Sequence, residues 1–117
     1  MLILDFSSWR DAPDVRTQPQ MCITAWRVFE DQGSDRFLVG LLPNEITLRT
    51  TTAIVMVDPV SRTWLTQSGR LYQTPDPPTQ DIQLQKTMRL LVQAGGVCGA
   101  LSDATEEIWA AMQRAVQ

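Results

Sequence analysis

The sequence predicts an α+β fold, in which an antiparallel β-meander of about five strands is followed by two C-terminal helices packed on one face of the sheet. Strand-forming residues interrupted by turn residues dominate positions 21–74, whereas apolar residues at helical spacing dominate positions 79–117. A chain of 117 residues is most simply one domain. Its segments are an irregular stretch (1–20), the meander (21–74), a proline-rich connector (75–78) and a helical hairpin (79–117).

The meander is predicted from turn signals that separate runs of strand formers. DQGSD (31–35) is a glycine-containing turn, Asp58–Pro59 starts a second turn, and Gln67–Gly69 makes a third. Within the long strand that precedes Pro59, the Thr- and Arg-containing first half is expected to have one solvent-facing side, and AIVMV (53–57) is expected to be buried on both sides. The strands are expected at 21–30, 36–43, 45–58, 62–66 and 70–73.

The two helices are predicted from capping residues as well as from apolar spacing. The first is expected to have Thr79 or Asp81 as its N-cap, with Gly95-Gly96 where its C-cap belongs. The second is expected to begin with an approximate capping box made by Asp103 and Glu106. We expect a tight connection between the two helices.

The PDPP segment (75–78) has two interpretations. Its spacing satisfies the PxxP pattern of polyproline ligands, which work in accessible tails. Here it lies between two predicted ordered elements, and residues before proline avoid the helical region. The sequence therefore favours a stiff connector.

The residue inventory removes several kinds of catalytic chemistry. The chain has no histidine, which excludes Ser-His-Asp and Cys-His sites, and its two cysteines are too few for a four-ligand zinc site. Cys22 and Cys98 are expected to be buried free thiols. No spacing among the carboxylates favours a catalytic pair. We therefore expect no enzymatic activity, no cofactor and no metal.

The charge balance bears on partners and location. The net charge is −3 and the pI is near 4.7, which disfavours nucleic-acid binding because that usually requires a basic surface. No run of 18 apolar residues occurs, so no membrane span is expected. The first residues lack the basic and apolar regions of a signal peptide, and we expect a cytoplasmic location.

The candidate contact residues lie on the expected free face of the sheet. Strand alternation predicts that Arg49, Arg62, Arg70 and Tyr72 contribute to a partner-binding surface there. A register error of one residue would invert this face.

A second interpretation of the sheet uses its neighbouring aromatic and basic residues. Trp26 with Arg27, Trp64 with Arg62, and Tyr72 with Arg70 could stack on single-stranded nucleic acid. The alternative, which the acidic net charge favours, is that the tryptophans are core residues.

Residues 51–78 combine a strand, an Asp-Pro turn, the hairpin T-x-SGR-x-Y and a proline-rich exit. This stretch resembles a segment of small uncharacterised proteins of proteobacterial phages and integrated elements. The resemblance covers about a quarter of the chain and carries no functional residues with it. It implies a mobile-element accessory protein, the setting of small inhibitors of host defence such as anti-CRISPR proteins.

The sequence thus favours a non-enzymatic protein-binding module whose partner is a host or phage protein that it inhibits. Homodimerisation through a free sheet edge or the terminal helix is compatible with this. A single-stranded nucleic-acid binder and a carboxylate-based hydrolase are the alternatives.

Overall fold

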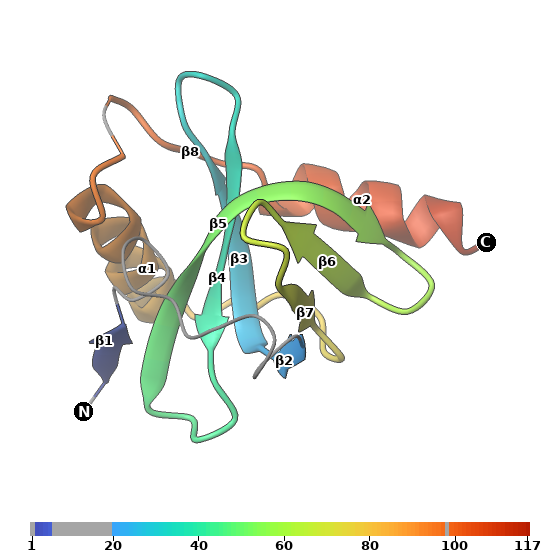
Figure 1. Cartoon of the computed structure of the whole chain (residues 1–117), viewed down its shortest axis with the longest axis horizontal. Helices are drawn as coiled ribbons and strands as arrows, with labels where there is room; N and C mark the ends of the chain where they lie inside the picture. Colours follow the sequence, from blue (N-terminus) through green and yellow to red (C-terminus); the bar gives the residue numbers. More distant parts are fainter. Residues whose placement is uncertain (1, 6–19, 98) are drawn as a thin grey trace.

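The computed structural model describes residues 2–5, 20–97 and 99–117, and has the expected α+β class with a mostly antiparallel sheet (Figure 1). The described part contains eight strands rather than the expected five. Trp9 and Cys98 lie outside the described residues. The strands are β1 (Ile3–Asp5), β2 (Gln20–Cys22), β3 (Thr24–Glu30), β4 (Arg36–Leu41), β5 (Thr47–Asp58), β6 (Thr63–Thr66), β7 (Leu71–Gln73) and β8 (Ser102–Asp103), and the helices are α1 (Ile82–Ala94) and α2 (Thr105–Ala115).

The sheet curls so that its two ends come together. Its strand order is β2-β7-β6-β5-β4-β3-β8, and β1 pairs with β5. Only Ile23 separates β2 from β3, so consecutive parts of the chain lie at opposite ends of this order. The β2–β7 and β1–β5 pairs are parallel, whereas the others are antiparallel. The simple meander that we expected is therefore completed by short parallel pairings, which local sequence patterns do not specify.

The long strand β5 has different neighbours along its length. Its first half pairs with β4 from Leu48 to Ala53, and its second half pairs with β6 from Ile54 to Asp58. The expected burial of the two halves is wrong, because Thr47–Thr51 are buried whereas Val55 and Met56 are exposed. The first half is buried because strands flank it on both edges and α1 packs nearby.

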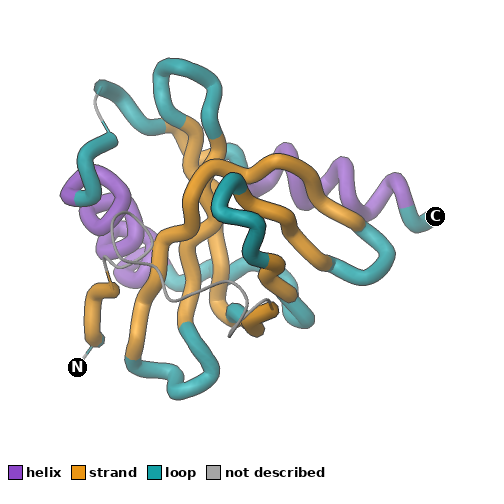
Figure 2. Tube along the Cα trace, in the orientation of Figure 1, coloured by secondary structure: helices purple, strands orange, loops and turns teal. Residues whose placement is uncertain are grey.

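The two helices cover opposite faces of the sheet, so the expected packing on one face is wrong. Met88 and Leu91 of α1 belong to a core cluster with Phe29 of β3, whereas Ile108 and Met112 of α2 belong to one with Val28. Adjacent residues of a strand point to opposite faces. Figure 2 shows the two helices on opposite sides of the molecule. Neither described helix is long and apolar enough to cross a membrane.

Between α1 and α2 the chain passes from one face of the sheet to the other beside β3, where it forms the short last strand β8. Between the helices, β8 pairs antiparallel with Phe29 and Glu30 in place of the expected tight connection. The side chain of Thr105 then continues the ladder, because its Oγ1 accepts a hydrogen bond from the Val28 amide at 2.8 Å and donates one to the Val28 carbonyl at 3.2 Å. A helical hairpin does not form because β8 takes the chain around the sheet edge.

The caps agree with expectation in α1 and differ in α2. Asp81 is the N-cap of α1 and accepts hydrogen bonds from two backbone amides, and Gly95 is its C-cap. In α2 the N-cap is Ala104, which makes no side-chain capping bond. The expected capping box does not form: Glu106 binds the guanidinium of Arg27, and Asp103 binds it through Oδ2 while its Oδ1 accepts a hydrogen bond from the Thr105 amide at 2.9 Å.

The proline-rich connector lies against the body of the protein. The Trp26 indole donates a hydrogen bond of 2.8 Å to the Asp76 carbonyl, and Arg62 donates one of 2.6 Å to the Pro75 carbonyl. Pro78 is buried. These contacts occupy carbonyl groups of the segment, which agrees with the connector interpretation.

Candidate functional site: an open strand edge beside a groove

The sheet splits at the first residues of β4, beyond which β5 continues without this neighbour. The last β4 pairing is that of Phe37 with Ala53, and beyond it β5 runs on to Asp58 with β6 as its neighbour. Among the described strands, none pairs with the opposite edge of Ile54–Asp58. The backbone amides and carbonyls on such an edge can pair with another strand.

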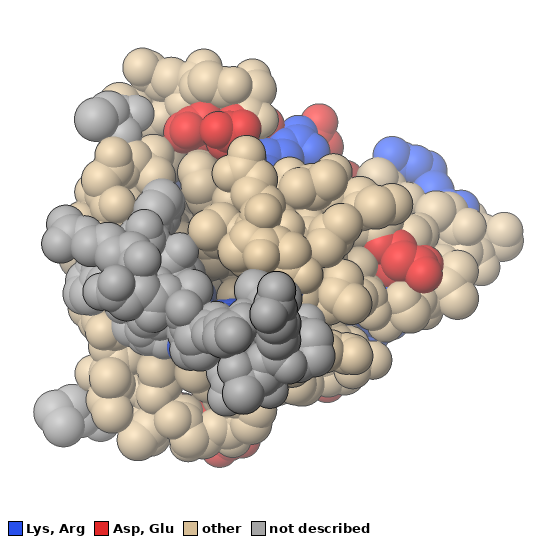
Figure 3. All heavy atoms as spheres, viewed as in Figure 1, with Lys and Arg blue, Asp and Glu red and all other residues tan. Residues whose placement is uncertain are grey.

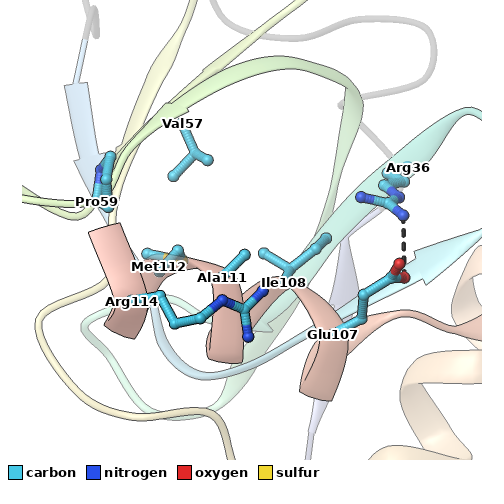
Figure 4. A pocket seen from close by; sticks show the side chains of 8 residues that line it. All are labelled: Arg36, Val57, Pro59, Glu107, Ile108, Ala111, Met112 and Arg114. Atoms are coloured by element: carbon cyan, nitrogen blue, oxygen red, sulfur yellow. Dashed lines mark hydrogen bonds and ion pairs between the residues drawn. The ribbon is translucent and has the colours of Figure 1, made fainter. Parts of the chain in front are cut away.

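A groove lies between this open edge and α2. It consists of two adjoining pockets of about 380 Å³ and about 260 Å³, which share Arg36, Val57 and Ile108. Figure 4 shows Val57 above a row formed by Ile108, Ala111 and Met112 of α2. The remaining lining residues are Pro59, Glu107 and Arg114 in the larger pocket, and Ser34, Asp35, Ile54, Val55, Met56 and Trp64 in the smaller.

A β-bulge exposes apolar residues beside the groove. The register of β5 against β6 shifts between Ile54 and Met56, so Val55 has no partner in β6. Ile54 and Val57 pack against the core cluster that contains Val28, Ile108 and Met112, which we call the inner core. Val55 and Met56 are left outside it and are 57% and 60% exposed. On the face seen in Figure 3, the surface over β5 and β6 is mostly uncharged.

Charged groups occupy both ends of the groove. Arg36, which both pockets share, bridges Glu30 at 2.7 Å and Glu107 at 3.1 Å, so the carboxylates of this cluster outnumber its guanidinium. Arg114 lines the end near Pro59, and no ion pair or hydrogen bond of its side chain is found among the described residues. Asp35 lines the end beside the β3–β4 turn. The groove therefore has an apolar floor formed by α2, the Arg36–Glu107 ion pair where its two pockets meet, and Arg114 and Asp35 toward its two ends.

The structure does not bring the four predicted contact residues into one exposed patch. Arg49, Arg70 and Tyr72 are 5%, 1% and 1% exposed, so the exposure that we expected for them is wrong. The curl of the sheet explains the burial of Tyr72, since β7 pairs with β2 and turns this side chain into the inner core. Arg49 contacts the sulfur of Met21 at 2.9 Å. Arg62 is half-buried, and its guanidinium lies 5.2 Å from the centre of the Trp109 ring.

The sheet tryptophans are core residues. Trp26 and Trp64 are fully buried and pack edge to face, with their ring centres 5.3 Å apart. Trp109 of α2 packs on Trp26 in the same way. Trp26, Trp64 and Tyr72 therefore present no ring face at the surface, whereas Trp109 is half-buried with Arg62 over its ring.

The main buried charge cluster joins β3 to β8 and α2. The buried Arg27 guanidinium donates hydrogen bonds to Asp103 at 2.8 Å and Glu106 at 3.0 Å, and another to the Thr79 carbonyl at 3.0 Å. Burial alone would raise the pKa of Asp103. Hydrogen bonds from Thr105 and Arg27 outweigh it, and the pKa lies below its ordinary value of 3.8. Both carboxylates bind the Arg27 guanidinium, which is typical of an ion-pair network that holds elements together.

The lowered pKa of Asp103 predicts a loss of stability in acid. Because the folded-state value is below the unfolded one, the stabilisation is complete above pH 3.8 and is lost as the pH falls through the folded-state pKa. In urea unfolding, the free energy of unfolding of the wild type should therefore exceed that of Asp103→Asn by an amount that shrinks below pH 3.8. A difference that stays constant with pH would contradict the assigned ion pair.

Sequence reasoning missed the groove, although strand lengths held a signal for it. The strand expected at 45–58 is much longer than its expected neighbours at 36–43 and 62–66. Neither neighbour can cover it fully, so part of one edge had to remain open. Among the described residues, no cluster of three or more potential metal ligands is found. Cys22 is a half-buried free thiol.

Comparison with known proteins found no matching family model, no matching curated protein and no matching solved structure.

Proposed function

We propose that this chain is a non-enzymatic protein-binding module that holds its partner at the groove between β5 and α2. The observation that carries the proposal is the edge of Ile54–Asp58 with which no described strand pairs, together with the exposed Val55 and Met56. Val60, which is 79% exposed, extends this apolar surface into the following turn. Proteins normally cover or block apolar strand edges, so an uncovered one indicates an interaction site.

The resemblance of residues 51–78 to phage and integrated-element proteins supports a more specific proposal. The open edge lies inside this stretch. We propose a cytoplasmic accessory protein that inhibits a bacterial host protein by occupying its surface, as anti-CRISPR proteins do. Blocking a surface of another protein requires a complementary surface and no catalytic group. The apolar lining of the groove and the strand edge beside it can supply such a surface.

The alternative functions gain no support from the described residues. Single-stranded nucleic-acid binding would need aromatic faces, and the sheet tryptophans are buried. A hydrolase would need a catalytic pair of carboxylates at a substrate pocket; Asp103 and Glu106 bind Arg27, and in the groove Glu107 binds Arg36 while Asp35 lies toward the opposite end from Arg114.

Affinity capture from a bacterial lysate tests the proposal when it is done with matched variants. Met56→Lys places a charge on the apolar surface, and Leu90→Lys makes the same change on α1, where Leu90 is 65% exposed. We expect a protein partner that resists nuclease and high salt, that Leu90→Lys retains, and that Met56→Lys binds at least about tenfold more weakly. Equal capture by both variants, or recovery of nucleic acid alone, would contradict the proposal.

A further inference from the structure

We infer that the groove receives an extended segment of a partner protein, which adds to the open edge of β5 as an antiparallel strand with an acidic residue directed at Arg114. This inference rests on the proposed function and specifies its mode of binding. Its three supports are the unpaired backbone edge, the position of the groove within the sheet, and the charges at the two ends of the groove.

The backbone edge selects a polypeptide as the occupant. The residues Ile54–Asp58 pair with β6 on one side, and no described strand pairs with the other. Amides and carbonyls alternate along such an edge, and an extended backbone is the partner that matches this alternation. Pro59 follows directly and ends the edge, because proline lacks an amide donor. The added strand is therefore short, with about five paired residues spanning about 17 Å.

The position of the groove fits a strand that continues the line of β4. Leu38 of β4 packs in the inner core with Ile108 of α2. Beyond the β4–β5 pairing, the same side of β5 borders the groove, whose lining includes Ile108 and Met112. Alternate side chains of an added strand would point to this apolar floor, because strand side chains alternate between faces. The other side chains would lie beside Val55 and Met56.

A strand that continues the line of β4 runs antiparallel to β5, and the charges at the groove ends then set the order of charges along it. Helix α2 follows the second half of β5, with Glu107 beside Arg36 and Met112 beside Pro59. Arg114 lies near the end of β5, and Asp35 near the point where the second half of β5 begins. A segment antiparallel to β5 would enter at Arg114 and leave at Asp35. Complementary charges therefore require the order acidic, apolar, basic along the segment.

The same charges disfavour a second copy of this chain as the occupant. Consider two copies whose β5 edges pair antiparallel, with Met56 of one copy opposite Met56 of the other. Asp58 of the second copy then lies opposite Ile54 of the first. This position is at the Asp35 end of the groove, where the like charges repel. Arg114 would meet no carboxylate from the second strand. A heterologous segment satisfies both ends, whereas self-pairing does not.

Selection from a library of random displayed peptides tests this inference, with the full chain as bait. We expect the selected peptides to carry apolar residues at every second position, with Asp or Glu before this run and Lys or Arg after it. A synthetic copy should lose binding when the amides on one edge are N-methylated and should keep binding when those on the other edge are methylated. Arg114→Glu should weaken it about fivefold, the effect of one exposed ion pair.

Four outcomes would overturn the inference. These are the recovery of no peptide, selected peptides without the charge order, binding that Met56→Lys leaves unchanged, and a concentration-dependent dimer that Met56→Lys dissolves. The test is separable from that of the proposed function. If lysate capture depends on Met56 while the peptides fail, the partner binds through a folded surface, and only the strand-addition mode is wrong.

Discussion

Replacement of Gly40 by alanine is expected to destabilise the fold by about 3 kcal/mol, because this position in β4 has no room for a methyl group. A Cβ atom at Gly40 would overlap Cγ2 of Ile23 and approach the Thr24 carbonyl oxygen at 2.9 Å. Ile23 is fully buried, and a backbone oxygen cannot move aside as a flexible side chain can. The irregularity at the start of β3, where Ala25 has a positive φ of 48° and the register against β4 shifts, brings these atoms close to Gly40.

Gly33→Ala is the matched control for this prediction. Gly33 lies in the exposed β3–β4 turn, where an added Cβ would meet only a carboxylate oxygen of Asp31 at 3.5 Å, an ordinary contact. Urea unfolding of both variants should give a large loss for Gly40→Ala and a change within about 0.5 kcal/mol for Gly33→Ala. Equal stability of Gly40→Ala and the wild type would contradict the close approach of Ile23 and Thr24 to Gly40.

Replacement of Arg27 by methionine is expected to cost about 2–3 kcal/mol of folding free energy. Methionine retains much of the apolar stem but leaves Asp103 and the Thr79 carbonyl without their shared donor. The cost lies below that of a fully buried pair because the side chains of Asp103 and Glu106 are 24% and 66% exposed. The loss should loosen the start of α1 and the β8–α2 junction together, since Arg27 binds both.

Arg36→Met provides the comparison for Arg27→Met. Arg36 also contacts two carboxylates, those of Glu30 and Glu107, but its side chain is 35% exposed and that of Arg27 is 6% exposed. Loss of exposed ion pairs costs less than about 1 kcal/mol. Urea unfolding should therefore separate the two variants clearly. A smaller loss for Arg27→Met than for Arg36→Met would mean that the buried cluster does not join the elements as described.

Local sequence signals predicted the local elements of the fold. The DQGSD turn gave the β3–β4 hairpin, and the turn at Gln67–Gly69 gave the β6–β7 hairpin, because turn chemistry is set by neighbouring residues. Asp81 was predictable as a cap because its side chain needs only the amides of the next turn. The burial of Trp26 and Trp64 agrees with the interpretation that the acidic net charge favoured.

Long-range pairing decided what the sequence did not predict. The expected free face assumed an open meander, and the parallel β2–β7 pairing instead turns Tyr72 into the core. Asp103 and Glu106 have the spacing of a capping box, yet Arg27, distant in the sequence, binds both. The groove depends on where β4 stops beside β5, and residues 53–57 alone do not distinguish an open edge from a buried strand. A pattern of apolar residues specifies a strand but not its neighbours.

Site-specific photo-crosslinking tests the central claim, that the partner binds at the groove beside β5, most directly. A benzoylphenylalanine residue would replace Met56 in one protein and Leu90 of α1 in another, since both positions are exposed. After irradiation in a bacterial lysate, we predict one dominant protein adduct from position 56, resistant to nuclease, and none of the same size from position 90. An adduct of equal yield from both positions, or from position 90 alone, would contradict the claim.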